Sequence, residues 1–116
     1  MKRTPLIAKP PVERRSEPGR AAWKSPVWGS CQACGRHGLL LRHHVLTESK
    51  VRQAGGSPYD LRNAIQLGYY ACRCHRDHHH AVRRIPRSCV PDVAVEFAVE
   101  LLGRDGAQSF FERHYS

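Results

Sequence analysis

The sequence predicts a single small α+β domain, in which a hairpin and a helix surround a site rich in cysteine and histidine. Two segments in the middle of the chain have the composition of strands, and three later segments have the pattern of helices. The chain has 116 residues, of which only 41% are hydrophobic, so its core is expected to be modest. A domain of this size often needs disulfides or a structural metal to be stable.

The charge and the cysteine content indicate which class of partner the protein binds and in which cellular compartment it works. Nineteen Lys and Arg residues oppose ten Asp and Glu residues, which gives a formal charge of +9. A chain this basic is typical of proteins that bind a polyanion. The sequence has an odd number of cysteines, and no apolar run of signal-peptide or membrane-spanning length. We therefore expect a cytoplasmic protein without a membrane partner, whose clustered cysteines bind metal; scattered free thiols are the alternative.

Residues 1–22 differ from the rest of the chain in composition. They contain four prolines, several basic residues and no apolar period. We predict a disordered arm that contacts phosphates without reading sequence, or one that only keeps the protein soluble. Trp23 and Trp28 flank Pro26 and are expected to dock the chain on the folded domain, which is predicted to span residues 23–116.

The central part of the chain predicts a hairpin with a long connection. Residues 39–46 are apolar except at positions 42–44, and residues 64–70 alternate weakly and end in aromatic residues. Each segment is therefore predicted to be a strand. The polar segment between them, residues 47–62, contains Gly-Gly-Ser-Pro and is predicted to be a loop.

The first predicted helix covers residues 75–84 and ends just before a proline. It places His75 and His79 four residues apart, hence on one face. His78 and His80 are expected to be bystanders, because His75 and His79 already serve the required face.

Two C-terminal helices are predicted within residues 92–115. Asp92 is the expected N-cap of an amphipathic helix that ends at Gly103, and residues 107–115 form a shorter helix. Phe110 and Phe111 are expected to face inward. Both helices are interpreted as packing elements without a catalytic role.

Four cysteines in two local pairs form a candidate structural zinc site. Cys31 and Cys34, separated by two residues, can turn both sulfur atoms toward one ion, and Cys72 and Cys74 supply a second pair. The second pair is more closely spaced than usual, so Cys89 or one of the histidines remains an alternative to Cys72. A bound Zn²⁺ would fasten the start of the first strand to the start of the first helix, which adds stability that a small core lacks.

His43 and His44 make the end of the first strand a candidate site for phosphodiester hydrolysis. Neighbouring residues of a strand point to opposite faces. One histidine can therefore bind a divalent cation while the other, as a neutral imidazole, takes a proton from water. The alternative is a polar strand end that is merely exposed to solvent.

Taken together, these motifs resemble the HNH endonuclease family, of the zinc-knuckle type often found in phage and prophage genomes. The resemblance covers residues 31–82 and implies a ββα-metal fold over about residues 31–84, in which a hairpin and a helix hold one divalent ion. This chain has Ala71 where the family usually has the first cysteine of C-x-x-C-H. The matching segments are Cys31-Gln-Ala-Cys34, Leu41-Arg42-His43-His44-Val45, Asp60-Leu61-Arg62-Asn63 and Cys74-His75-Arg76-Asp77-His78-His79.

The resemblance also implies a role for individual residues. His43 and His75 are the expected ligands of a catalytic divalent cation (Mg²⁺, Mn²⁺, Ni²⁺ or Zn²⁺), and His79 is a third ligand or a phosphate contact. His44 is the expected general base, and Asn63 is expected to hydrogen-bond the loop and orient that base. The implied function is a metal-dependent endonuclease that nicks or cuts double-stranded DNA. It leaves 3′-hydroxyl and 5′-phosphate ends, and it acts in a phage-infected or prophage-bearing bacterial host.

Two other functions are also consistent with the basic charge and the clustered cysteines. A non-catalytic zinc-dependent DNA-binding or regulatory module would use the same scaffold, with the histidines exposed or packed. An RNA-binding or ribosome-associated zinc protein is the other alternative, but the sequence lacks the aromatic stacking pattern of single-strand binders. The sequence does not identify a partner in phage packaging or host defence.

Overall fold

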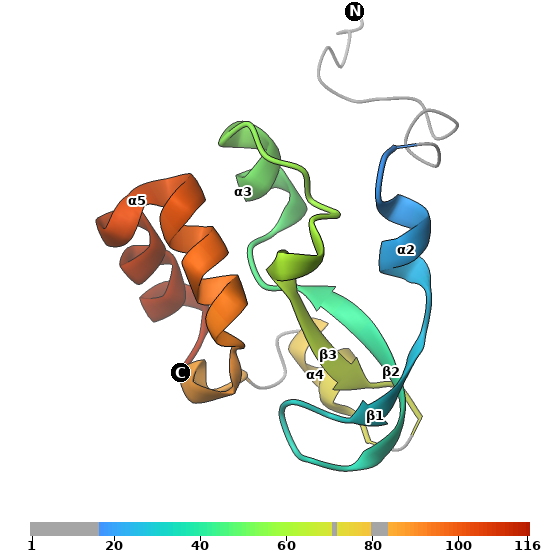
Figure 1. Ribbon diagram of the computed structural model, residues 1–116. Helices are drawn as coiled ribbons and strands as arrows, with labels where there is room; N and C mark the ends of the chain where they lie inside the picture. The colour runs from blue at the N-terminus through green and yellow to red at the C-terminus, as the bar shows by residue number, and fades with distance from the viewer. Residues whose placement is uncertain (1–16, 71, 80–83) are drawn as a thin grey trace, which may run out of the picture.

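Three antiparallel strands, in the order β1-β2-β3, form the sheet of this small α+β fold (Figure 1). The strands are β1 (Val27–Ser30), β2 (His37–His44) and β3 (Ala64–Gly68). A computed structural model describes residues 17–70, 72–79 and 84–116, with the backbone alone described at His79. Among these residues, no helix combines the length and apolar character that crossing a membrane would require.

Both predicted strands are present, with ends that differ from the prediction. β2 begins two residues earlier and ends at His44, because the next two backbone N–H groups turn toward Asn63. β3 ends at Gly68, so Tyr69 and Tyr70 lie beyond the strand. The sequence does not predict β1, since four residues are too few to establish an alternating pattern.

The segment predicted as a loop contains two short helices. The helix α3 (Glu48–Gln53) begins after Thr47, whose side-chain oxygen accepts a hydrogen bond from the Lys50 N–H at 3.2 Å. The 3-10 turn η1 (Leu61–Asn63) leads into β3. A threonine N-cap ahead of a charged turn is a recognised signal for a helix start, so α3 could have been predicted.

Residues 17–22 of the segment predicted to be a disordered arm are folded. Residues 1–16 lie outside the described part of the chain, but Glu17 accepts two hydrogen bonds of 2.9 Å from the Arg52 guanidinium. The helix α2 (Arg20–Lys24) follows, and its Trp23 is only 3% exposed. Trp23 therefore docks this end of the chain as predicted, whereas Trp28, at 72% exposed, does not.

The helix α4 (Cys74–His79) begins one residue before the predicted start. Residues 80–83 of the predicted helix, which include His80, lie outside the described residues. The 3-10 turn η2 (Arg87–Cys89) then connects to the C-terminal helix.

The two predicted C-terminal helices meet at a sharp kink within α5 (Asp92–His114). Gly103 interrupts the helix with φ 81°, a conformation that glycine adopts without the penalty of a side chain. The first helix thus ends where it was predicted to end, and the second begins before residue 107. Asp92 is the first helical residue, and Pro91 occupies the N-cap position. Figure 1 shows the two halves of α5 folded back beside each other.

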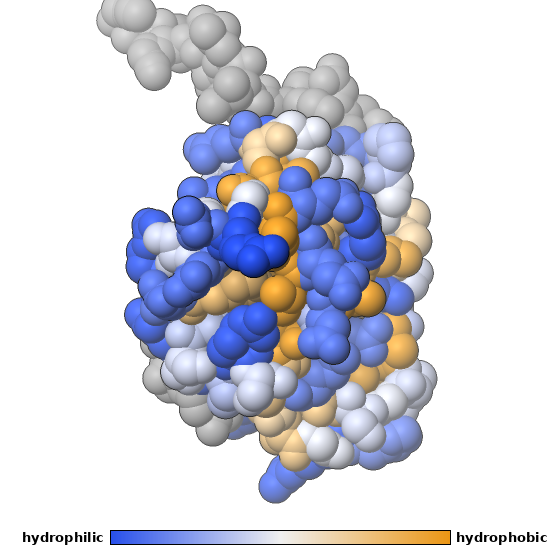
Figure 2. Space-filling view, turned by 60° about the vertical axis from the view of Figure 1, so that its left-hand side comes forward, coloured by the Kyte–Doolittle hydropathy of each residue, from blue (hydrophilic) through white to orange (hydrophobic). Residues whose placement is uncertain are grey.

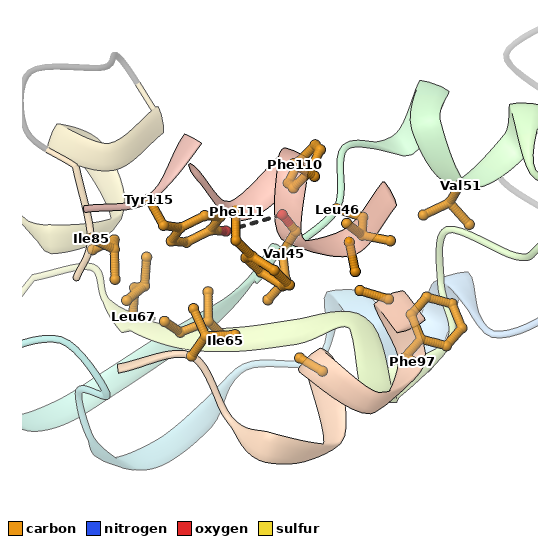
Figure 3. Close-up of a cluster of buried hydrophobic side chains, with 14 of the residues drawn as sticks. Val45, Leu46, Val51, Ile65, Leu67, Ile85, Phe97, Phe110, Phe111 and Tyr115 are labelled. Atoms are coloured by element: carbon orange, nitrogen blue, oxygen red, sulfur yellow. Dashed lines mark hydrogen bonds between the residues drawn. The ribbon is translucent and has the colours of Figure 1, made fainter. Parts of the chain in front are cut away.

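The hydrophobic core lies between β3 and the two halves of α5 (Figure 3). Ile65 and Leu67 of β3 are fully buried, and Phe110 and Phe111 face inward as predicted. The buried Tyr115 hydroxyl donates a hydrogen bond of 3.0 Å to the Val45 carbonyl, next to His44. The core therefore holds the end of β2 in place.

Figure 2 shows a narrow apolar band bordered by hydrophilic residues on the face of the molecule that its view brings forward. A groove of about 360 Å³ lies on α5, and its apolar lining includes Val95, Val99, Ala107 and Phe111. Val99 is 37% exposed. Part of the apolar surface of α5 is therefore left uncovered by the described residues.

The turn that follows β1 crosses the sheet to reach the outer edge of β3. Gln32 N–H donates to the Gln66 carbonyl at 2.9 Å, and Gln66 N–H donates to the Gln32 side-chain oxygen at 2.7 Å. Because β1 and β3 lie on opposite sides of β2, the sheet has to curl strongly for this contact to form. The curl brings Cys31 and Cys34 to the end of β3 and the start of α4.

Candidate metal centre and histidine groove

The four cysteines predicted to bind zinc converge in the structure. The Sγ atoms of Cys31, Cys34, Cys72 and Cys74 all lie within 4.8 Å of one another. Four sulfurs that bind a zinc ion tetrahedrally at about 2.3 Å lie roughly 4 Å from one another. The cluster is therefore compatible with a structural zinc site. Among the described residues, it is the one group of three or more His, Cys, Asp or Glu side chains whose ligand atoms converge this closely.

The surroundings of the cluster suit metal-bound thiolates. Burial disfavours ionisation of Cys31, but hydrogen bonds from backbone groups of Gly68, Cys34 and Ala33 outweigh it and lower the pKa to about 7. Burial and the neighbouring thiols raise the pKa of Cys74, as expected when several sulfurs crowd together without a cation. A Cβ atom at position 68 would overlap the Cys72 sulfur, so glycine is required there.

The structure favours Cys72 over Cys89 as the fourth member of the cluster. Cys89 lies outside the group, with its sulfur 4.0 Å from the carbonyl oxygen of Ala33. The tight spacing of Cys72 and Cys74 is accommodated because Cys72 precedes α4 and Cys74 is its first residue.

The histidines line a second site, a groove of about 650 Å³ beside the end of β2. Among the described residues, β1 pairs only with the first half of β2, so the second half has an open edge on that side. The groove is strongly basic, because Glu48 is the single acidic residue among the described residues that line it. The charged and titratable lining residues are Lys24, Arg42, His43, His44, Glu48, His75, His78, Arg84, Arg113, His114 and Tyr115.

His43 faces α4, together with His75 and also His78. The ring centroid of His43 lies 5.4 Å from that of His75 and 4.7 Å from that of His78. Two imidazoles that bind one ion through nitrogens about 2.1 Å away have ring centroids roughly 5 Å apart. These spacings therefore suit a shared divalent ion. The side chain of His79, the predicted third ligand, lies outside the described part of the chain.

His44 points the other way, toward α2. Its ring stacks on Trp23 with centroids 4.2 Å apart and also lies 6.0 Å from the ring of Tyr59. Burial lowers the pKa of His44, which keeps its imidazole neutral at neutral pH. The opposite orientations of His43 and His44 agree with the prediction for adjacent strand residues.

One ring nitrogen of His44 is left without a partner. The buried Nε2 atom has no hydrogen bond among the described residues. The backbone of Pro58 favours the charged form of the ring, an effect that burial outweighs. In the neutral tautomer whose proton is on Nδ1, Nε2 keeps a lone pair that can accept a proton.

Asn63 connects the end of β2 to the start of β3. Its side chain is fully buried, accepts a hydrogen bond of 2.8 Å from the Leu46 N–H and donates one of 3.0 Å to the Leu46 carbonyl. Its own carbonyl accepts from the Val45 N–H at 2.9 Å. Asn63 thus holds the backbone just after His44.

Asn63→Ala is expected to destabilise the fold by about 2–4 kcal/mol, because two buried backbone groups of Leu46 lose their partners. The free energy of unfolding, measured by urea denaturation, tests this. Gln32→Ala is a suitable comparison, since its side-chain bond to Gln66 is exposed, and we expect a smaller loss. Equal stability of Asn63→Ala and wild type would contradict the assigned role.

Arg42 fixes the helix that covers His44. Its Nη1 group donates to the carbonyls of Ala22, Trp23 and Ser25 at 2.9, 3.3 and 2.7 Å. These carbonyls belong to the C-terminal end of α2, where a cation is favourable. Arg42 therefore positions Trp23 on the His44 ring.

Several groove residues do not follow from the sequence reasoning. His78 lies three residues after His75, and that spacing is a usable signal for a shared helix face. Arg84, Arg113 and the C-terminal turn of α5 enter the groove through tertiary packing, for which the sequence carries no local signal. No family model, curated protein or solved structure matches the chain, so its function has to be inferred from its own residues.

Proposed function

We propose that the protein is a metal-dependent DNA endonuclease built on a ββα-metal domain of the HNH type. In this assignment β2 and β3 are the hairpin and α4 is the helix. The observation that carries the proposal is the division between His43 and His44 at the end of β2. One ring faces the histidines of α4, while the other keeps an unpaired nitrogen beside the same basic groove.

His44 is the general base in this proposal. Hydrolysis of a phosphodiester needs a water molecule that loses its proton as it attacks in line with the leaving oxygen. The His44 Nε2 lone pair is available for that proton, and the Pro58 backbone stabilises the positive charge that then develops on the ring. Trp23 and Asn63 fix the ring and the backbone that carries it.

His43 and His75 would hold the divalent cation, with His78 close enough to contribute. A cation bound there would supply positive charge next to the phosphoryl and leaving oxygens. Imidazole ligands favour Mn²⁺, Ni²⁺ or Zn²⁺ over Mg²⁺. The four cysteines would bind a separate Zn²⁺ that stabilises the fold.

The groove would bind the DNA backbone through its charge. Lys24, Arg84 and Arg113 line it together with five histidines, so a polyanion is the complementary ligand. Contacts of this kind position a nucleic acid without reading its sequence. Double-stranded DNA is the substrate implied by the resemblance.

Cleavage of a supercoiled plasmid with added Mn²⁺, Ni²⁺, Mg²⁺ or Zn²⁺ tests the proposal. We expect nicked or linear product from the wild type with at least one of these ions. His43→Ala should lower the rate by about 100-fold or more, because a first-row ion loses a ligand.

His37→Ala is the matched control for this experiment. His37 is an exposed histidine at the opposite end of the same strand, and its loss should leave cleavage unchanged. Absence of cleavage by the wild type with every ion would reject the enzyme assignment.

A non-catalytic zinc-dependent DNA-binding module is the second candidate. It is favoured by the convergence of the cysteines, which is closer than that of the histidines. This module would bind DNA in a salt-sensitive manner, with zinc as its single metal, and His43→Ala would not change the affinity.

A further inference from the structure

Three large aromatic side chains are exposed near the end of the sheet that carries the cysteine cluster. Trp28 is 72% exposed, Tyr69 47% and Tyr70 78%. Single exposed aromatic residues are common on protein surfaces, but a group of them usually marks a binding site. The function proposed above gives these side chains no role.

The strand register places two of these residues in one row across the sheet. Trp28 of β1 pairs with Leu39 of β2, and the Tyr69 N–H donates to the Leu39 carbonyl at 3.2 Å on the other side. Residues directly opposite one another project from the same face of a sheet. Trp28, Leu39 and Tyr69 therefore share a face, and Tyr70 extends it, because its ring packs edge-on against Tyr69 at 4.6 Å.

This aromatic row continues into the proposed catalytic groove. The Tyr69 ring centroid lies 6.0 Å from that of His75, a proposed metal ligand. Leu39 and His43 are four residues apart on β2, so their side chains project from the same face about 13 Å apart.

We propose that Trp28 and Tyr69, with Tyr70, form a stacking platform for unpaired DNA bases. The aromatic rings would take the bases, while the basic groove takes the phosphates of the same strand. Arg73 and Arg76, which follow Tyr70 by three and six residues in the chain, are both exposed and add positive charge to this part of the surface. The inference rests on the proposed function for its position beside the cleaved bond, and it assigns a substrate with a single-stranded segment there.

The binding of a labelled oligothymidylate, followed by fluorescence anisotropy, tests the platform. The full-length protein is used with its zinc and without added catalytic ion. Trp28→Ala is expected to weaken binding about five-fold or more, since loss of one stacked base has an effect of this size. Trp28→Phe should restore most of the affinity, because it keeps an aromatic face.

Val93→Ala serves as the matched control, since Val93 is 52% exposed on α5 and lies outside the platform. It should bind like the wild type. Equal affinity of Trp28→Ala and wild type would overturn the proposal. A second result would also overturn it. If Trp28→Ala converts a dimer to a monomer in sedimentation but leaves the oligonucleotide affinity unchanged, the aromatic residues serve self-association.

Cleavage and binding separate this inference from the proposed function. If the plasmid is cut but Trp28→Ala binds oligothymidylate normally, the platform is wrong and the nuclease assignment stands. If nothing is cut but binding depends on Trp28, the platform stands on a protein without nuclease activity. Tighter, Trp28-dependent binding of oligouridylate than of oligothymidylate would overturn the assignment to DNA.

Discussion

Replacement of Cys74 by serine is expected to unfold most of the protein. Cys74 is buried at the start of α4, and its sulfur is one of the four cysteine sulfurs that lie within 4.8 Å of one another. Structural zinc contributes about 10–16 kcal/mol in zinc-finger peptides, which is comparable to the whole stability of a typical domain, about 5–15 kcal/mol. Circular dichroism during thermal unfolding should show the loss of the cooperative transition, and elemental analysis should show the loss of bound zinc.

Cys89→Ser provides the matched control for this substitution. Cys89 lies outside the cluster and is only half-buried at the margin of the core, with its sulfur 4.0 Å from the Ala33 carbonyl oxygen, so its replacement by serine should cost less than about 1 kcal/mol. A strong chelator should reproduce the effect of Cys74→Ser in the wild type. Wild-type stability of Cys74→Ser, or loss of zinc from Cys89→Ser, would show that the ligands have been wrongly assigned.

His44→Ala is expected to reduce the rate of DNA cleavage by about 10²–10⁴-fold, the usual contribution of a general base. Binding of the divalent ion should persist, because the proposed ligands His43, His75 and His78 lie on the opposite face of β2 from His44. Cleavage kinetics and calorimetric titration of Mn²⁺ measure the two effects separately. An unchanged cleavage rate would remove His44 from the mechanism.

His44→Phe distinguishes a chemical role of His44 from a structural one. Phenylalanine keeps a ring that can stack on Trp23, which lies 4.2 Å from His44, but it cannot accept a proton. We expect His44→Phe to be as stable as His37→Ala and as inactive as His44→Ala. Activity near the wild-type rate would show that the ring is needed only for packing.

The sequence predicts the local parts of this structure well. Both longer strands, the helix after the cysteines and the break at Gly103 follow from short-range patterns of apolar residues, glycine and proline. Cysteine spacing also indicates Cys31, Cys34 and Cys74 as members of one cluster, whereas the choice of Cys72 over Cys89 comes from the structure. The orientations of His43 and His44 follow from the two-residue period of a strand.

What the sequence cannot predict depends on contacts between distant segments. The groove joins α2, the end of β2, α4 and the last turn of α5, which are separated by up to about ninety positions. The aromatic row cannot be predicted for the same reason, since Trp28 and Tyr69 are aligned only because both lie opposite Leu39 of β2. The folding of residues 17–22 depends on contacts such as the ion pair between Glu17 and Arg52, which composition does not reveal.

The crossing of Gln32 to the outer edge of β3 has a consequence for aggregation. The exposed edge of a sheet can pair with another chain, and proteins usually cover it. Here the cover is the cysteine turn itself, which is bonded to Gln66 in the middle of β3. If the four cysteines hold a structural metal, its removal would release the turn and uncover β3 while its apolar residues are still extended. We therefore expect chelator-treated protein to self-associate through this strand before it unfolds completely.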